Sequence, residues 1–298
     1  MNCSESYTGE YNEPLHIASI FIILTTSALG VFLPTILRAF KGEGLDFAVA
    51  LGKFFGAGVI TATGFVHVFP EAVASLTDPC VGGFFEEYTA AAGLIAMLAV
   101  LLSHLIQYIA EGTYLRQKEP TYDTEKAPEA HSHGLFLAEA DKRTLSTYIL
   151  EVAVGIHSVI IGMDLGISDE EFITLLIALC FHQFFEGIGL GYRIAEIDYK
   201  HKAYGYLSAG TYAVTTPLGI AIGIAMRVTD SGTDSTGGLL TIGVLDSAAA
   251  GILIYSSVLF IMEEFNGRFR GMGVTRQILC FVGFYAGCGL MATLGIWA

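Results

Sequence analysis

The sequence predicts an all-α integral membrane protein with eight transmembrane helices, and three observations support this class. Hydrophobic residues make up 53% of the chain and charged residues only 15%, whereas soluble domains contain about 25% charged residues. The apolar residues gather in segments of about 20 residues or more, the length that a helix needs to cross a bilayer. None of these segments alternates apolar and polar residues as a strand does.

The eight apolar segments account for most of the chain. We expect the spans at residues 15–37, 47–73, 89–109, 145–167, 172–192, 204–226, 239–262 and 276–297. No soluble domain remains, so residues 1–298 are interpreted as one transmembrane domain. The longest connection, residues 112–143, is polar and contains Pro120 and Pro128, and we expect it to be mostly disordered.

The charges predict an orientation and exclude one class of partner. A net charge of -14 argues against nucleic-acid binding, which requires a basic surface. Basic residues such as Arg38, Arg143 and Arg270 gather in the loops after the first, third, fifth and seventh segments, and the opposite loops are acidic. The positive-inside rule makes the basic loops cytosolic. Both termini are then extracellular, with the plasma membrane as the expected location and an organelle membrane as the alternative.

Two cysteines, Cys3 and Cys80, fall outside the apolar segments and on the same side of the membrane in this topology. That side is oxidising, so the two thiols could form a disulfide. The sequence leaves open whether they are paired or free, because pairing cannot be deduced from sequence alone.

Ionisable side chains at bilayer depth are costly and usually functional. His157 and His182 lie near the centres of the fourth and fifth segments, which form a hairpin, so the two imidazoles share one depth. Glu186 follows His182 by four residues and lies on the same helical face. A single buried histidine is more often a packed core residue, but two with a carboxylate favour a metal site. Imidazole with carboxylate suits zinc, iron and related metals, whereas calcium and magnesium prefer oxygen ligands.

Two segments carry a resemblance to a known family. HSVIIG at residues 157–162 and HQFFEG at 182–187 resemble the paired signature motifs of the ZIP family of metal transporters. The resemblance extends over nearly the whole chain and is most similar to the plant and fungal branch that takes up zinc or iron. Further similar stretches are GFVHVFPEA at 64–72, TTPLG at 215–219 and LDSAAAGILIY at 245–255.

The resemblance implies a fold and an assembly. Helices one to three would be related to helices six to eight by an inverted repeat, with helices four and five between the two halves. Inverted repeats with a site near the middle of the bilayer are a common transporter plan. The resemblance also implies a homodimer, with zinc, iron, manganese or cadmium as the transported ion and no cofactor.

One departure from the family concerns the number of metals. The resemblance implies that some bacterial members have a two-metal site, with acidic residues where this sequence has Ile161, Gln183 and Thr216. We therefore expect a single metal. Its expected ligands are His157, His182 and Glu186, with Ser158 and Gln183 as weaker partners.

Other ionisable residues are candidates for the ion's route. The expected entrance is lined by His67, Glu71, Asp164 and Asp246, and the expected exit by His104, Glu111, Glu263 and Glu264. Asp164 could alternatively be a helix-end carboxylate facing water, and the exit glutamates could be solvated helix ends. His131 and His133 in the long loop could bind metal weakly or be incidental.

Glycines in the central segments have a structural interpretation, because small residues allow membrane helices to pack closely. The glycines concerned are Gly155, Gly162, Gly187, Gly189 and Gly191.

The sequence therefore predicts a transporter that imports zinc or iron by alternating access and is not an enzyme. No phosphate-binding GxxxxGK[ST] motif is present, so nothing indicates ATP use. The alternative is an intramembrane metal-dependent hydrolase, although the HExxH motif is absent and Glu186 would have to act as both ligand and base. A metal-sensing receptor would require a soluble domain that the chain lacks.

Overall fold

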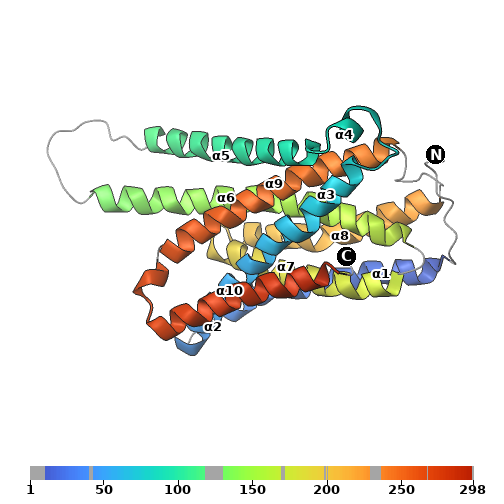
Figure 1. The fold of residues 1–298 in the computed structure, drawn as a ribbon. Coiled ribbons are helices and arrows are strands. Elements are labelled where there is room, and N and C mark those ends of the chain that lie inside the picture. The colour runs from blue at the N-terminus through green and yellow to red at the C-terminus, as the bar shows by residue number, and fades with distance from the viewer. Residues whose placement is uncertain are drawn as a thin grey trace.

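The computed structural model describes residues 11–39, 43–117, 130–168, 172–197, 199, 201–228, 236–266 and 268–296. All regular structure in these ranges is helical. Eight spans among these residues are long and apolar enough to cross a membrane, which confirms the predicted fold class. Figure 1 shows the long helices running side by side along a common direction.

The first half of the chain supplies three spans. They are α1 (Glu13–Ala39), the composite of α2 (Glu43–Ala62), η1 (Thr63–Val68) and α3 (Phe69–Leu76), and α5 (Ala91–Gln117), with the short α4 (Gly83–Glu87) before α5. The remaining spans are α6 (Ala130–Ile167), α7 (Phe172–Glu196), α8 (Lys202–Val228), α9 (Thr236–Asn266) and α10 (Val274–Leu294), with η2 (Arg268–Gly271) between α9 and α10.

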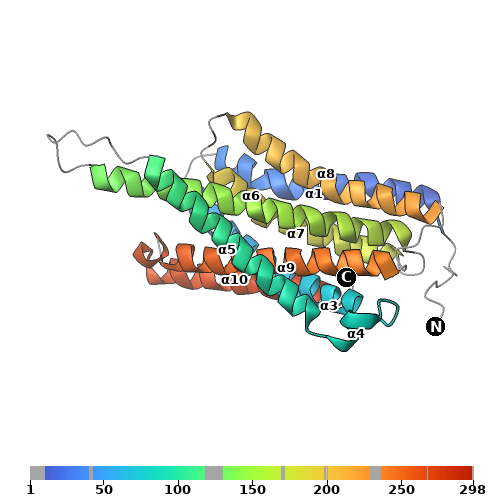
Figure 2. The ribbon, with the colours of Figure 1, turned by 90° about the horizontal axis from the view of Figure 1, so that it is seen from above.

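Two helices continue beyond their predicted membrane segments. Helix α5 reaches Gln117 and helix α6 begins at Ala130, so both ends of the 112–143 connection are helical, where we expected disorder. Residues 138–143 (Ala-Glu-Ala-Asp-Lys-Arg) are mostly good helix formers, so they favour a helix here without an apolar pattern. Figures 1 and 2 show the start of α6 projecting past the other helices. The side chains of His131 and His133 lie outside the described part.

The spans form two bundles. In the first bundle α6 packs on α8, and α1 packs on both α7 and α8. In the second bundle α2 packs on α10, and α9 packs on α3 and α5. The bundles meet where α6 contacts α9 and α7 contacts α2. Figure 2 shows α6 and α7 lying between the α1–α8 pair and the α9–α10 pair.

The pairing follows the inverted repeat that the family resemblance implies. Exchanging spans one to three with spans six to eight, and span four with span five, converts the α1–α7 contact into the α8–α6 contact. The same exchange converts α2–α10 into α9–α5 and α2–α7 into α9–α6, and all these pairs are in contact. Spans five apart run in opposite directions through the membrane, so the two halves are inverted relative to each other.

Glycines bring the helices of the first bundle close together. A Cβ atom on Gly162 of α6 would lie 2.4 Å from the Thr216 carbonyl oxygen of α8, and one on Gly191 of α7 would lie 2.3 Å from the Val31 carbonyl oxygen of α1. The close-packing role is confirmed for these two glycines, for Gly187, which also faces α1, and for Gly189, which faces Gly56 of α2 in the second bundle. Gly155 differs, because its nearest neighbour would be a side-chain atom at 3.8 Å.

Candidate metal site

The second span changes its helical winding next to the site. Segment η1 (Thr63–Val68) is a π-helix between α2 and α3, and it buries Thr63, Gly64 and His67. Pro70 follows in the first turn of α3 and has no N–H to donate to a regular α-helical hydrogen bond. Short π-helical turns occur often at functional sites. Here the wider turn directs the His67 side chain into the protein.

Three histidines from three different spans meet in the interior. The ring of His182 on α7 lies 5.2 Å from the ring of His67 on η1 and 5.6 Å from the ring of His157 on α6, measured between centroids. All three side chains are buried. The shared depth of His157 and His182 that the sequence predicts is thus present, and His67 joins them from the other bundle.

Two buried carboxylates lie beside these imidazoles. The Nε2 atom of His182 is 3.8 Å from Oε2 of Glu186 on the same helix, and Nδ1 of His157 is 3.9 Å from Oδ1 of Asp246 on α9. Glu71, one turn beyond His67 on α3, interacts electrostatically with His157 and Asp246. The cluster therefore draws its side chains from both bundles.

The polar atoms of this cluster lack hydrogen-bond partners among the residues that the structure describes. Both ring nitrogens of His67, His157 and His182 and both carboxylate oxygens of Glu186 and Asp246 are buried without a hydrogen bond, as is the Ser158 hydroxyl. Native proteins leave few buried polar groups unpaired, because burying them unpaired is costly. Imidazole nitrogens and carboxylate oxygens are the donor atoms that zinc and iron accept, so the residues present fit a divalent transition metal.

The cluster is not closed around an ion in this conformation. No three His, Cys, Asp or Glu side chains among the described residues stand close enough together to hold a metal ion. Ligands about 2 Å from a tetrahedral zinc lie about 3.3 Å from one another, slightly less than the 3.8 and 3.9 Å separations of the two pairs. A small approach of α6 and α9 would shorten the His157–Asp246 separation to this value, whereas His182 and Glu186 share one helix and would need a side-chain rotation.

Gln183, which we expected as a weaker metal partner, is hydrogen-bonded to two residues of α8. The Tyr212 hydroxyl donates to the Gln183 side-chain oxygen at 2.8 Å and to its backbone carbonyl at 2.6 Å. The Gln183 amide nitrogen in turn donates to the Thr216 hydroxyl. These bonds tie α7 to α8 and occupy the amide, whereas the Ser158 hydroxyl remains buried without a partner.

The expected entrance residues separate into two groups. His67 and Asp246 lie within the histidine cluster, with Glu71 next to them. The sequence contained a signal that places His67 with the other histidines. His67 and Glu71 repeat the four-residue spacing of His182 and Glu186. Asp164, in contrast, is exposed near the end of α6, and its backbone carbonyl accepts the Ser168 N–H.

The expected exit residues also have other partners. His104 is exposed, with Nδ1 at 3.3 Å from the Tyr255 hydroxyl. Glu264 lies 2.6 Å from the Lys53 amine and 3.7 Å from Arg143, and Lys53 is also 2.7 Å from Glu196. Glu263 borders the same group of charges, and the Glu111 side chain lies outside the described part.

We call Lys53, Arg143, Glu196 and Glu264 the ion-pair cluster. Its members come from α2, α6, α7 and α9, which are the spans that carry His67, His157, His182 and Asp246. The ion pairs join the two bundles at the membrane face with the basic loops.

One expectation about cysteines concerns the opposite face. Cys80 is disulfide-bonded, and Cys180, Cys280 and Cys288 have free thiols. Cys3, the partner that we considered, lies outside the described residues. A disulfide at Cys80 fits an oxidising compartment on that side.

A multi-pass helical protein that buries imidazoles and carboxylates between two inverted halves has the architecture of a membrane transporter for metal ions. The family model of the ZIP zinc transporters matches residues 13–139 and 114–295. The chain belongs to the ZIP family and is therefore a divalent-metal transporter rather than an enzyme.

Individual relatives agree with the family assignment. The chain is 34% identical to Fe(2+) transport protein 2 of Arabidopsis thaliana over 96% of this chain and 87% of that protein. It is 34% identical to zinc transporter 3 of Oryza sativa subsp. japonica over 95% of this chain and 88% of that protein. Zinc-regulated transporter 2 of Saccharomyces cerevisiae (strain ATCC 204508 / S288c) is 28% identical, over 99% and 96% respectively.

Proposed function

We propose that the protein imports zinc or iron into the cytosol by binding one ion between its two bundles. The observation that carries this proposal is the set of buried imidazole nitrogens and carboxylate oxygens without hydrogen-bond partners. His157, His182 and Glu186 serve as the principal ligands from the first bundle. His67 and Asp246 face them from the second bundle and complete the shell in one of the states of the transport cycle.

The position of the site between the bundles supports alternating access. An ion held by side chains of both bundles is exposed to one membrane face or the other when one bundle moves against its partner. The same movement changes the separations between the ligands, so binding and release are linked to the motion. In this proposal the ion-pair cluster holds the basic face closed, and it must separate before the ion leaves on that side.

Charge supports the direction of transport. The basic loops face the cytosol in our proposal, and the acidic loops with both termini face the outside of the plasma membrane. An acidic surface raises the local concentration of cations, an effect that salt screens. Capture from the acidic side and release at the basic side therefore constitute import. We also propose that the protein is a homodimer.

The choice between zinc and iron rests on chemistry that both metals satisfy. Imidazole and carboxylate ligands accept zinc, ferrous iron, manganese and cadmium. The names of the two relatives at 34% identity divide between iron and zinc. We therefore propose that the site takes up both metals, with manganese and cadmium as competing ions.

Uptake into proteoliposomes tests the proposal. Purified protein should accumulate radioactive zinc, and unlabelled iron, manganese and cadmium should compete to different extents. His182→Ala should lower uptake by about tenfold or more, because even residues that only support metal ligands contribute about 10- to 100-fold. His201→Ala is the matched control, since His201 is exposed before α8 and should leave uptake unchanged. Normal uptake by His182→Ala would rule out the assigned site.

A further inference from the structure

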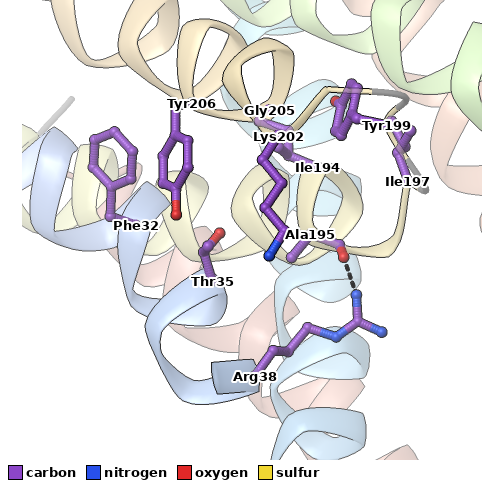
Figure 3. A pocket seen from close by; sticks show the side chains of 10 residues that line it. All are labelled: Phe32, Thr35, Arg38, Ile194, Ala195, Ile197, Tyr199, Lys202, Gly205 and Tyr206. Carbon is purple, nitrogen blue, oxygen red and sulfur yellow. Dashed lines mark hydrogen bonds between the residues drawn. The ribbon is translucent and has the colours of Figure 1, made fainter. Parts of the chain in front are cut away.

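A hollow lies away from the metal site, at the membrane face with the basic loops. It has a volume of about 430 Å³ and lies between the end of α1, the end of α7 and the start of α8. Figure 3 shows the side chains that line it. They are Phe32, Thr35, Arg38, Ile194, Ala195, Ile197, Tyr199, Lys202, Gly205 and Tyr206.

The hollow has two cations and no neighbouring carboxylate among the residues that line it. Arg38 and Lys202 are its charged members, and neither forms an ion pair with another described residue. The chain as a whole carries a net charge of -14. Among the described residues the two positive charges of this pocket have no ion-pair partner, so the pocket is suited to an anion.

The polar groups converge from two helices. Figure 3 shows the Lys202 amine and the Thr35 and Tyr206 hydroxyls directed into the same space. The Arg38 guanidinium donates one hydrogen bond to the Ala195 carbonyl at the end of α7, which fixes its position at the edge of the hollow. A guanidinium carries five N–H donors, so others are left for a ligand.

The depth of the hollow indicates where the anion comes from. Arg38 is the last residue of the span Glu13–Arg38, and Lys202 is the first residue of the span Lys202–Val228. The two cations therefore lie at the level where a bilayer places its phosphate groups.

The wall on the membrane side is aromatic. The rings of Phe32 and Tyr206 lie 6.4 Å apart and nearly stacked, one to two turns deeper in the membrane than the cations. Tyr206 is 55% exposed, and its amphipathic ring is of the kind that lies at the membrane interface. A ligand with a phosphate at the cations can thus extend a hydrocarbon chain past these rings into the bilayer.

We propose that this hollow binds the phosphate headgroup of an anionic glycerophospholipid from the leaflet next to the basic loops. Arg38 and Lys202 contact the phosphate, the two hydroxyls donate hydrogen bonds, and the acyl chains lie along Phe32 and Tyr206. Basic pockets between membrane helices on the cytosolic side bind such headgroups in the same way. The bound lipid joins the ends of α1, α7 and α8, all of which belong to the first bundle.

Native mass spectrometry of the purified full chain tests this lipid site. The protein in detergent is titrated with phosphatidylglycerol, with phosphatidylcholine, and with phosphatidylglycerol in the presence of millimolar inorganic phosphate. We expect phosphatidylglycerol to remain bound in preference to phosphatidylcholine. The double variant Arg38→Gln, Lys202→Gln should lower the retained phosphatidylglycerol by about tenfold, since each basic residue near a surface contributes to anionic-lipid binding.

The matched control is Arg270→Gln. Arg270 is an exposed arginine in η2 at the same membrane face, outside the hollow, and its replacement should leave phosphatidylglycerol retention unchanged. Equal retention by the double variant and the wild type would overturn the proposal. Displacement of the lipid by inorganic phosphate would also overturn it, because the pocket would then select a soluble anion. Unchanged thermal unfolding of the double variant in lipid-free detergent confirms that a loss of lipid does not reflect misfolding.

Discussion

His67 and His104 lie in the same bundle but have different surroundings. His67 is buried beside the His182 ring, whereas His104 is exposed next to the Tyr255 hydroxyl. We predict that His67→Ala reduces zinc uptake by about tenfold, as expected for loss of a group that supports or completes a metal shell. His104→Ala should change uptake by less than about twofold, since surface substitutions have small effects. The measurement is initial uptake rate at matched surface expression.

The opposite pattern would contradict the placement of His67. If His67→Ala transports normally and His104→Ala does not, the ion follows a route along α5 rather than through the histidine cluster. A loss in both variants would assign His104 to the exit that the sequence suggested.

Ile161 bears on the number of metals. Its side chain packs against the apolar cluster that contains Ile23, Leu165 and Ile220. Isoleucine has no carboxylate that could hold a second ion at this position. We predict that the purified wild-type protein binds about one zinc per chain, because three strong ligands with open positions form a single site. Elemental analysis of protein equilibrated with zinc measures this ratio.

A substitution extends the same prediction. Ile161→Glu should add a ligand and slow metal release, although burying the carboxylate also lowers stability. Its zinc content and its release rate after addition of a chelator are compared with those of Ile161→Gln, which has similar size and no charge. Two equally occupied ions in the wild type would show that other residues form the second site.

The burial and shared depth of the ligands that we propose could be predicted from sequence, but their neighbours only in part. His157, His182 and Glu186 occupy the centres of two adjacent spans, and counting residues along regular helices gives their depth. His67 lies on a π-helical turn, where counting at 3.6 residues per turn fails. The approach of Asp246 to His157 depends on how α9 packs against α6, which periodicity does not determine.

The contact between α6 and α8 can be tested with two glycines of one helix. Gly162 faces the α8 backbone, and an added Cβ would lie 2.4 Å from the Thr216 carbonyl oxygen. Overpacking of this kind costs about 1–3 kcal/mol. We predict that Gly162→Ala lowers the thermal unfolding temperature and uptake together.

Gly155→Ala is the matched control on α6. The nearest atom to its added Cβ is Thr215 Cγ2 at 3.8 Å, and alanine is a better helix former than glycine. Its unfolding temperature should be unchanged or slightly higher. Equal destabilisation by both substitutions would show that helix–helix distance is not what glycine provides at position 162.

The element boundaries agree with the sequence where the membrane sets them. Apolar length predicts each span to within a few residues, because the bilayer thickness limits it. Outside the membrane this limit no longer applies. Helix α5 continues to Gln117, and helix α6 already begins at Ala130. Helix propensity is only a weak guide in such polar segments, so their helical ends were not foreseen.

At the scale of the whole molecule, the ion-pair cluster links the bundles. Lys53→Met removes its contacts with both Glu196 and Glu264. Each partly exposed pair contributes about 1 kcal/mol or less, and 1–2 kcal/mol changes a population ratio by about 5- to 30-fold. We predict a larger population that is open to the basic face.

Thiol labelling measures this shift. A cysteine is introduced at Thr147, which is buried beside Arg143, in a background with Cys180, Cys280 and Cys288 replaced by alanine. A membrane-impermeant reagent added at the basic face should label it faster in Lys53→Met than in the wild type. Lys53→Arg keeps the charge and is the control. Identical labelling of all three proteins would show that the ion pairs do not hold this face closed.

The count of spans was predictable from the sequence and their inverted relationship was implied by the family resemblance, whereas the division into two bundles was not predicted. Composition and charge act along the chain and determine the number of spans and how they alternate. Which spans pack together depends on local side-chain shape, such as the glycines that bring α6 to α8 and α7 to α1. That information lies in pairs of segments far apart in the sequence.

The π-helical turn at Thr63–Val68 has a consequence for insertions and deletions. Such a turn contains one residue more than an α-helix would use, and one residue corresponds to a rotation of about 100° about the helix axis. The wider turn absorbs this extra residue, so deleting it would restore a regular α-helical turn and leave α2 and α3 facing their present neighbours. The side chains of the turn itself, His67 among them, would change direction instead. A homologue with a one-residue gap at this place would therefore keep the packing of both flanking helices and differ where His67 enters the ion-binding cavity, and the gap could be used to sort relatives by the geometry of those cavities.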